Sequence, residues 1–341
     1  MTLKSFLAAG AFVAASAVAM PAMAGETLDA VRDRGELRCG VNTGLAGFSN
    51  PDSEGNWQGL DVDVCKAIAA SILGDPEAVS YTPLTAQQRF TALQSGEVDV
   101  LSRNTTWTLT RDTSLGLHFA PITFYDGQGF MVPKDLGVES VHDLSGATIC
   151  VQPGTTTELN LADFFRANDM DFEPVVIEDF EEVNAAYFAG RCDAYTTDSS
   201  GLASVRSTAP DPSAHMILPE IISKEPLGPA VRQGDDEFFN IVKWVVYALI
   251  EAEEYGVNSE NLEEMRETSE NPGIKRLLGA EPGMGEHLDL ETDWAYNAIE
   301  AVGNYGEIFE RNVGPDTDLG LERGINALWT DGGLMYAMPV R

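Results

Sequence analysis

The chain has 341 residues, with 54 acidic and 21 basic side chains and a formal net charge of −33. This charge argues against a nucleic-acid-binding protein, because no basic face could neutralise phosphates, and against docking on an anionic membrane surface. The length indicates two domains, and a hydrophobic content of 44% is enough for sizeable cores.

Residues 1–24 have the pattern of a secretory signal peptide. Lys4 is the only charged residue before Glu26, residues 5–20 are apolar or small, and Ala22-Met23-Ala24 matches a cleavage site. The alternative is a membrane anchor, but the apolar run is short and weakly hydrophobic. We therefore predict that residues 1–24 are removed and that the mature chain is exported.

The first part of the mature chain alternates strands and helices. The apolar pattern predicts a helix that places Val64, Ile68 and Ile72 on one face, with Asp61 and Asp63 at its positive dipole end. This βαβ order predicts a parallel sheet flanked by helices. The predicted elements are a strand at 36–42, a helix at 62–73, a strand at 79–83, a helix at 86–94 and a strand at 98–102.

The same pattern starts again after residue 130, so the fold class is α/β with two units in series. A long helix is then predicted at 237–253, followed by a glycine-rich, mixed tail that runs to residue 341. In the second unit, the predicted strands are 147–151, 174–177 and 192–196, and the predicted helices are 156–167 and 181–188.

Four cysteines in an exported chain favour disulfides, and four allow three pairings. We prefer Cys39–Cys65, because the first lies on a strand and the second on the helix expected above it. We prefer Cys150–Cys192 because neighbouring strands lie within disulfide reach. Four buried free thiols remain the alternative. No CxxC pair or histidine cluster indicates a metal site, so we expect neither metal nor cofactor.

Candidate binding residues follow three predicted strands, at the sheet edge where open α/β folds place ligands. After residue 102, Arg111 is suited to a bidentate pair with a carboxylate, and Thr106 adds a hydroxyl. The alternative for Arg111 is a solvated side chain paired with Asp112.

The second segment, 154–158 (GTTTE), joins a strand to a helix. Free amides of Thr155 and Thr156 at the positive end of the helix dipole would face an anion. The alternative is an ordinary capping box formed by Thr155 and Glu158.

The third segment, 196–200 (TTDSS), offers Asp198 as an acceptor for an ammonium group, although aspartate is also a common helix cap. Together the three segments supply a cation, a helix terminus and a carboxylate. That set complements a zwitterion such as a free amino acid, held by charge-assisted bonds between two closing lobes.

Over essentially its whole mature length, the chain resembles the periplasmic solute-binding proteins of the polar amino-acid family of ABC transporters, family 3. The resemblance starts with the motif GLDVDVCKAIA at residues 59–69 and includes Arg111, Gly154-Thr155-Thr156 and Asp198. Further segments resemble the general L-amino-acid subgroup, whose members bind glutamate, glutamine, aspartate, asparagine or a wider set. These segments are 103–106, 125–130, 223–229, 303–309 and 332–337.

The resemblance implies roles for individual residues. It assigns the α-carboxylate of the ligand to Arg111, Thr106, Thr155 and Thr156, and the α-ammonium to Asp198 and the region of Asn104. Asn42 matches a position that reads the ligand side chain, and a neutral amide there favours amides or a broad range. Leu45 stands where relatives that bind basic ligands often carry an aromatic residue. Trp57 or Trp107 is a candidate for an aromatic wall, with a packing role as the alternative for both, and Arg103 is a candidate partner for an acidic side chain.

The resemblance also implies the architecture, a two-lobed type II periplasmic binding protein fold with a two-stranded hinge. Lobe 1 would comprise residues 25–128 and 230–341, with an extended C-terminal tail, and lobe 2 residues 129–229. The chain would cross near 129–132 and return near 226–230. The implied function is a monomeric, non-enzymatic periplasmic component of an ABC importer that delivers L-amino acids to the permease. A receptor-linked amino-acid sensor and a dehydratase-like enzyme are the alternatives.

Overall fold

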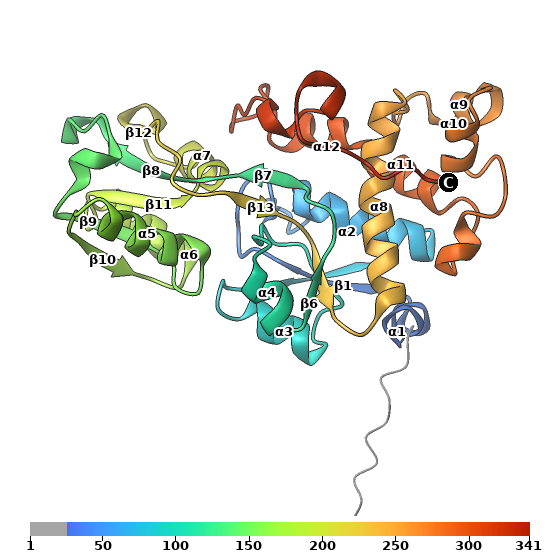
Figure 1. Ribbon diagram of the computed structural model, residues 1–341, viewed down its shortest axis with the longest axis horizontal. Coiled ribbons are helices and arrows are strands. Elements are labelled where there is room, and N and C mark those ends of the chain that lie inside the picture. The colour runs from blue at the N-terminus through green and yellow to red at the C-terminus, as the bar shows by residue number, and fades with distance from the viewer. Residues whose placement is uncertain (1–25) are drawn as a thin grey trace, which may run out of the picture.

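The computed structural model describes residues 26–341, so the predicted signal peptide lies outside the described residues. Two lobes lie side by side, each with its own five-stranded sheet, and strands β7 (Phe124–Asp126) and β13 (Glu225–Leu227) run between them (Figure 1). We call the elements around the first sheet lobe 1 and those around the second sheet lobe 2. This confirms the predicted mixed α/β class.

The first sheet has the order β4-β1-β5-β14-β6. β1 pairs in parallel with β4 and β5, whereas β14 is antiparallel to β5 and β6. The predicted strand at 79–83 is confirmed residue for residue. The strands are β1 (Leu37–Val41), β4 (Val79–Pro83), β5 (Val100–Leu101), β6 (Leu117–Phe119) and β14 (Ala230–Arg232), with helices α1 (Glu26–Arg34), α2 (Leu60–Leu73), α3 (Arg89–Ser95) and α4 (Leu109–Ser114).

The second sheet has the order β10-β9-β11-β8-β12. β9 pairs in parallel with β10 and β11, and β8 joins from the other side in antiparallel pairing. The predicted helix at 156–167 is confirmed over its whole length. The strands are β8 (Gln128–Pro133), β9 (Ala147–Val151), β10 (Phe172–Val176), β11 (Ala194–Asp198) and β12 (His215–Ile217), with helices α5 (Thr156–Ala167), α6 (Phe180–Phe188) and α7 (Ser199–Ser207).

The two strands between the lobes, β7 and β13, pair antiparallel, and we call them the hinge strands. Residues 129–132, where we expected the chain to cross, instead lie inside β8 of the second sheet. Phe130 and Val132 are fully buried there in the core of lobe 2, which fixes this segment in the sheet. The crossing therefore comes a few residues earlier, whereas the expected return at 226–230 overlaps β13.

The C-terminal part of the chain is largely helical and covers lobe 1. α11 packs along α2, which lies between β1 and α11 and is buried over most of its length. The sequence predicted only α8 of this set, because the segments that follow it are short and rich in glycine. The helices are α8 (Asp236–Glu254), α9 (Leu262–Thr268), α10 (Pro272–Leu277), α11 (Trp294–Val302) and α12 (Tyr305–Asn312).

The C-terminal tail also contacts the start of hinge strand β7, at Thr123 and Tyr125. Asn326 pairs with the backbone of Tyr125 at two points: the Tyr125 N–H donates to Asn326 Oδ1 (2.7 Å), and Asn326 Nδ2 donates to the Tyr125 carbonyl oxygen (3.0 Å). The Tyr305 hydroxyl donates to the carbonyl oxygen of Thr123 (2.8 Å). Residues close to the C-terminus thus hold the start of β7 in place.

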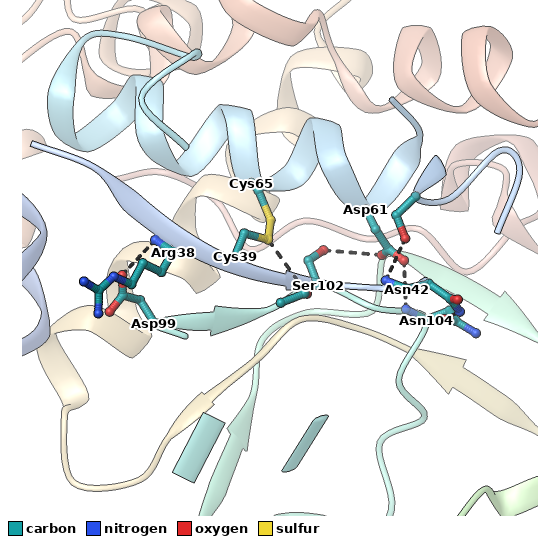
Figure 2. The surroundings of a disulfide bond; sticks show 10 residues. Arg38, Cys39, Asn42, Asp61, Cys65, Asp99, Ser102 and Asn104 are labelled. Carbon is teal, nitrogen blue, oxygen red and sulfur yellow. Dashed lines mark hydrogen bonds between the residues drawn. A yellow bond between two sulfur atoms is a disulfide. The ribbon is translucent and has the colours of Figure 1, made fainter. Parts of the chain in front are cut away.

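Two disulfides form, Cys39–Cys65 and Cys150–Cys192, the pairing expected from the layout. Cys39 lies on β1 and Cys65 on α2 above it (Figure 2), and Cys150 lies on β9. Cys192 lies just before β11 rather than on it, because that strand starts two residues later than predicted. Within residues 26–341, no helix is both long enough and apolar enough to span a membrane.

Candidate ligand-binding site

A cavity lies between the lobes, where the carboxyl ends of strands from both sheets face each other. The non-atom space between its walls, open solvent at the mouth included, is about 450 Å³. Lobe 1 contributes Asn42, Leu45, Arg89, Arg103, Asn104 and Thr106, and lobe 2 contributes Gln152, Thr155, Thr156, Thr157, Phe180, Thr197, Asp198 and Gly201.

The lobes touch around this cavity. At one side, Thr85 Oγ1 of lobe 1 donates to Glu178 Oε1 of lobe 2 (2.7 Å). Further in, the hydroxyl oxygens of Thr106 and Thr156 lie 3.4 Å apart, again with one residue on each lobe. The structure is therefore a closed form, in which a small ligand would be surrounded on both sides.

A buried carboxylate holds the lobe 1 loop that carries Arg103 and Asn104. Asp61 lies at the start of α2 and accepts from the Asn104 N–H (2.8 Å) and the Ser102 hydroxyl (3.3 Å), as Figure 2 shows. Burial raises the pKa of Asp61 to about 6. Asn104 itself has a positive φ of 34°, a conformation that asparagine tolerates. Asp61 thus holds the loop, besides lying at the dipole end of α2.

Three buried arginines surround the lobe 1 side of the cavity. Arg89 donates through Nη1 to Thr105 Oγ1 (3.3 Å), but its Nε has no hydrogen-bond partner within residues 26–341. Arg103 donates to the Leu84 carbonyl oxygen (2.9 Å). Burial lowers the pKa of Arg89, and it lowers the pKa of Arg103 and Arg111 to about 10. Buried cations of this kind favour an anion in the cavity.

Asp198 faces these arginines from the end of β11. It is buried, its side chain does not cap α7, and its carboxylate accepts no hydrogen bond from the described residues. Burial raises its pKa, and the neighbouring Asp126 and Glu225 carboxylates add to the effect. A cationic group placed in the cavity would satisfy this carboxylate and restore its charge.

The first turn of α5 supplies neutral donors. The Thr155 hydroxyl caps the helix by accepting from the Glu158 N–H (3.0 Å). The Glu158 carboxylate accepts from the Gly154 N–H (2.9 Å) instead of the Thr155 N–H, so only one bond of the capping box forms. The first N–H groups of a helix have no acceptor within the helix, and they lie at the positive end of the helix dipole. Thr155 and Thr156 both line the cavity, so the cap and an anion site coexist here.

The structure brings together most of the residues predicted for the site. Those that line the cavity are Asn42, Arg103, Asn104, Thr106, Thr155, Thr156 and Asp198. The side-chain amide of Asn42 donates to Asn104 Oδ1 (2.9 Å), as Figure 2 shows, so these two amides lie side by side.

Three predicted residues lie outside the lining. Arg111 lies behind Thr106, donating to its carbonyl oxygen (2.9 Å) and covering the ring of Phe90. Trp57, on β3 (Trp57–Gln58), which pairs with β2 (Asn50–Pro51), packs beside Tyr81 with ring centroids 6.0 Å apart. Trp107 stacks on Phe119 at the surface. The aromatic side chain in the lining is Phe180.

The lining also contains residues that the sequence did not single out, chiefly Arg89, Gln152, Phe180 and Thr197. Arg89 lies in the middle of the predicted helix at 86–94, where a charged residue reads as solvent-facing. The helix instead begins at Arg89, and this puts its side chain at the carboxyl end of the sheet. A signal was present, because the segment directly follows the end of a predicted strand.

The geometry thus offers buried guanidinium groups from lobe 1, and helix-terminus amides together with the Asp198 carboxylate from lobe 2. Among residues 26–341 no cluster of three histidine, cysteine or acidic side chains could hold a metal ion. Such a set of charges is suited to binding a small zwitterion between two lobes. The fold and the cavity therefore define a two-lobed solute-binding protein.

Comparison with known families agrees with this class. Residues 37–261 match the model of the bacterial extracellular solute-binding proteins, family 3, and the chain belongs to that family.

Relatives match over nearly the full length. The General L-amino acid-binding periplasmic protein AapJ of Rhizobium johnstonii is 60% identical over 99% of both chains. The Glutamate/glutamine/aspartate/asparagine-binding protein BztA of Rhodobacter capsulatus is 59% identical over 96% of this chain and 97% of its own. A solved periplasmic binding protein of an ABC transporter from Brucella ovis, with glutathione bound, is 59% identical. It has a TM-score of 0.90 and covers 92% of this chain and 99% of its own.

Proposed function

We propose that this protein is the extracytoplasmic solute-binding component of an ABC importer. It binds free L-amino acids between its lobes, including glutamate, glutamine, aspartate and asparagine, and delivers them to the membrane permease. The observation that carries the proposal is the buried, unpaired Nε of Arg89 on the same cavity as the unpaired carboxylate of Asp198. The names of the relatives favour this binding role over the sensor and the dehydratase-like enzyme.

The ligand's α-carboxylate would lie at the Arg89 guanidinium and the first-turn amides of α5, with Thr106 and Thr156 beside it. Arg111 supports this end of the site from behind Thr106 through its positive charge. The α-ammonium would pair with Asp198. Both pairs are charge-assisted and lie away from solvent, where such bonds are strongest.

The ligand's side chain would extend toward Asn42, Asn104 and Gln152. Carboxamides both donate and accept hydrogen bonds, so this wall suits amide and acid side chains alike. Arg103 adds a cation that favours glutamate and aspartate. Leu45 and Phe180 give the same cavity an apolar surface, which is consistent with a broad range of ligands.

Delivery requires the lobes to open and close. We propose that residues 25–128 together with 230–341 move against residues 129–229, by bending of the hinge strands. The chain would work as a monomer in the periplasm after removal of residues 1–24. The permease would then recognise the closed, loaded form.

Titration calorimetry on refolded, ligand-stripped protein tests the proposal. The panel is L-glutamate, L-glutamine, L-aspartate, L-asparagine, L-leucine, L-alanine, L-lysine and L-histidine, and we expect micromolar or tighter binding of several of them. Asp198→Asn and Arg111→Ala should abolish or strongly weaken binding. Arg166→Ala is the matched control, because Arg166 is an exposed arginine paired with Asp163 on lobe 2.

Binding of none of these amino acids would refute the proposed function. Full affinity in Asp198→Asn would refute the assignment of the ammonium group to that carboxylate. Glutathione belongs in the panel as well, since a homologue was solved with it bound. Its γ-glutamyl end carries the same α-ammonium and α-carboxylate as a free amino acid, so we expect it to use the same groups.

A further inference from the structure

Glu225 is a buried carboxylate on hinge strand β13, and the binding proposal above does not use it. It is 1% exposed, and each of its oxygens accepts two hydrogen bonds. Oε1 accepts from Asn160 Nδ2 (2.8 Å) and Ser223 Oγ (2.6 Å). Oε2 accepts from Thr106 Oγ1 (2.6 Å) and Thr156 Oγ1 (2.7 Å).

These bonds connect the two lobes through the hinge. Thr106 lies on the lobe 1 loop beside β13, and its neighbour Trp107 donates its N–H to the Pro226 carbonyl oxygen (2.8 Å). Thr156 is the first residue of α5 in lobe 2. A single carboxylate oxygen thus holds one hydroxyl from each lobe, so the protein's own side chains connect the lobes in the closed arrangement.

The two threonine hydroxyls are the ones expected to meet the ligand's α-carboxylate. A hydroxyl has one proton to donate, and a carboxylate only accepts. While Thr106 and Thr156 donate to Glu225, they cannot donate to a second carboxylate in the cavity. The protein's own carboxylate and the ligand's carboxylate therefore compete for the same two protons.

We propose that Glu225 is an internal latch, a positioning residue that closes the ligand-free lobes through Thr106 and Thr156 and that the ligand's α-carboxylate must displace. The inference rests on the proposed function. Because the latch stabilises only the ligand-free state, it lowers the affinity for every α-amino acid by a common factor. Glu225 thus sets the affinity for the α-carboxylate that all these ligands share. The residues that face the ligand's side chain set the selectivity among amino acids.

Glu225→Gln isolates this role, since glutamine fits every contact. Its oxygen can accept from Asn160 and Ser223, while its amide donates to both threonine oxygens and leaves their protons free for the cavity. The negative charge is removed at the same time. We expect about tenfold tighter binding of L-glutamate by calorimetry, the gain from recovering one charge-assisted hydrogen bond. The bridge that remains uses neutral hydrogen bonds, which are weaker than the charge-assisted bonds to the carboxylate. We therefore also expect the ligand-free protein to open more and to show a larger radius of gyration in small-angle X-ray scattering.

Two further variants make the test specific. Glu220→Gln is the matched control, because Glu220 accepts from Ser140 and Val141 within lobe 2 only, so it should change neither readout. In a Thr106→Val/Thr156→Val background, Glu225→Gln should tighten binding clearly less, because the released protons are absent and only the removal of the negative charge remains.

Unchanged or weaker L-glutamate binding in Glu225→Gln, with an unchanged radius of gyration, would show that Glu225 is a static hydrogen-bond partner and would overturn the latch. A gain of the same size in the valine background would overturn the competition for protons. If the unaltered protein binds no amino acid, the proposed function fails, and the scattering comparison alone still decides whether Glu225 closes the lobes.

Discussion

Replacing Asp61 by asparagine should stabilise the protein at neutral pH and leave it nearly unchanged in acid. Asp61 is 4% exposed, and its only described hydrogen-bond donors are the Asn104 N–H and the Ser102 hydroxyl. An asparagine at this position can accept from the same N–H with its oxygen and donate to the Ser102 hydroxyl with its amide. The change therefore removes a buried charge and keeps the contacts.

The size of the effect follows from the pKa of Asp61. Burial raises it from 3.8, the ordinary value, to about 6 in the folded protein. The folded state therefore binds the proton of Asp61 more tightly than the unfolded state does. The stability that this proton contributes is fully present below pH 4 and is lost as the pH rises through 6. A difference of about 2 units at ~1.36 kcal/mol each gives about 3 kcal/mol.

Urea denaturation of both proteins at pH 4 and pH 7.5 measures this term. The free energy of unfolding of Asp61→Asn minus that of the unaltered protein should rise by up to about 3 kcal/mol between these pH values. Asp163→Asn, at an exposed carboxylate, is the control and should show little pH dependence. If the two proteins differ in free energy of unfolding by the same amount at both pH values, ionisation of Asp61 does not destabilise the folded protein and the prediction is wrong.

Three other outcomes are expected. Arg89→Met should weaken L-glutamate binding about 100-fold or more in calorimetry, because a buried charge-assisted contact is lost; unchanged affinity would remove Arg89 from the site. Replacing Cys150 and Cys192 by serine should lower the free energy of unfolding by about 4 kcal/mol, from a sequence separation of 42; an equal denaturation midpoint would contradict this. Asn326→Ala should cost about 2 kcal/mol and speed amide exchange at Tyr125, whereas unchanged protection would mean that the tail does not hold the hinge.

Much of the fold was predictable because each sheet is built from strand–helix repeats with clear periodicity. β4 and α5 were predicted to the residue. The helices after α8 were not, since they are short. Two of them, α11 and α12, pack on α2, a helix that the sequence already places against its own sheet. Nothing local in the sequence shows that a helix is covered on two sides.

The site was predictable where a residue directly follows a strand, as with Asn104, Thr106 and Asp198. Arg89 was missed because its position within a helix depends on where that helix begins, the least certain feature of a sequence prediction. Arg111 and Trp57 lie outside the cavity lining, because their side chains pack on Phe90 and beside Tyr81. The resemblance assigns a role to a position and does not give the direction of the side chain.

The pairing of Asn326 with Tyr125 has a consequence for the order in which the molecule is completed. The two residues are 201 positions apart in the chain. Contacts of such long range form late, after local helices and strands are in place. Before the C-terminal segment packs on lobe 1, β7 can pair with β13, yet the N–H and the carbonyl oxygen of Tyr125 lack their Asn326 partners. The hinge therefore reaches its final geometry only after the last part of the chain has docked.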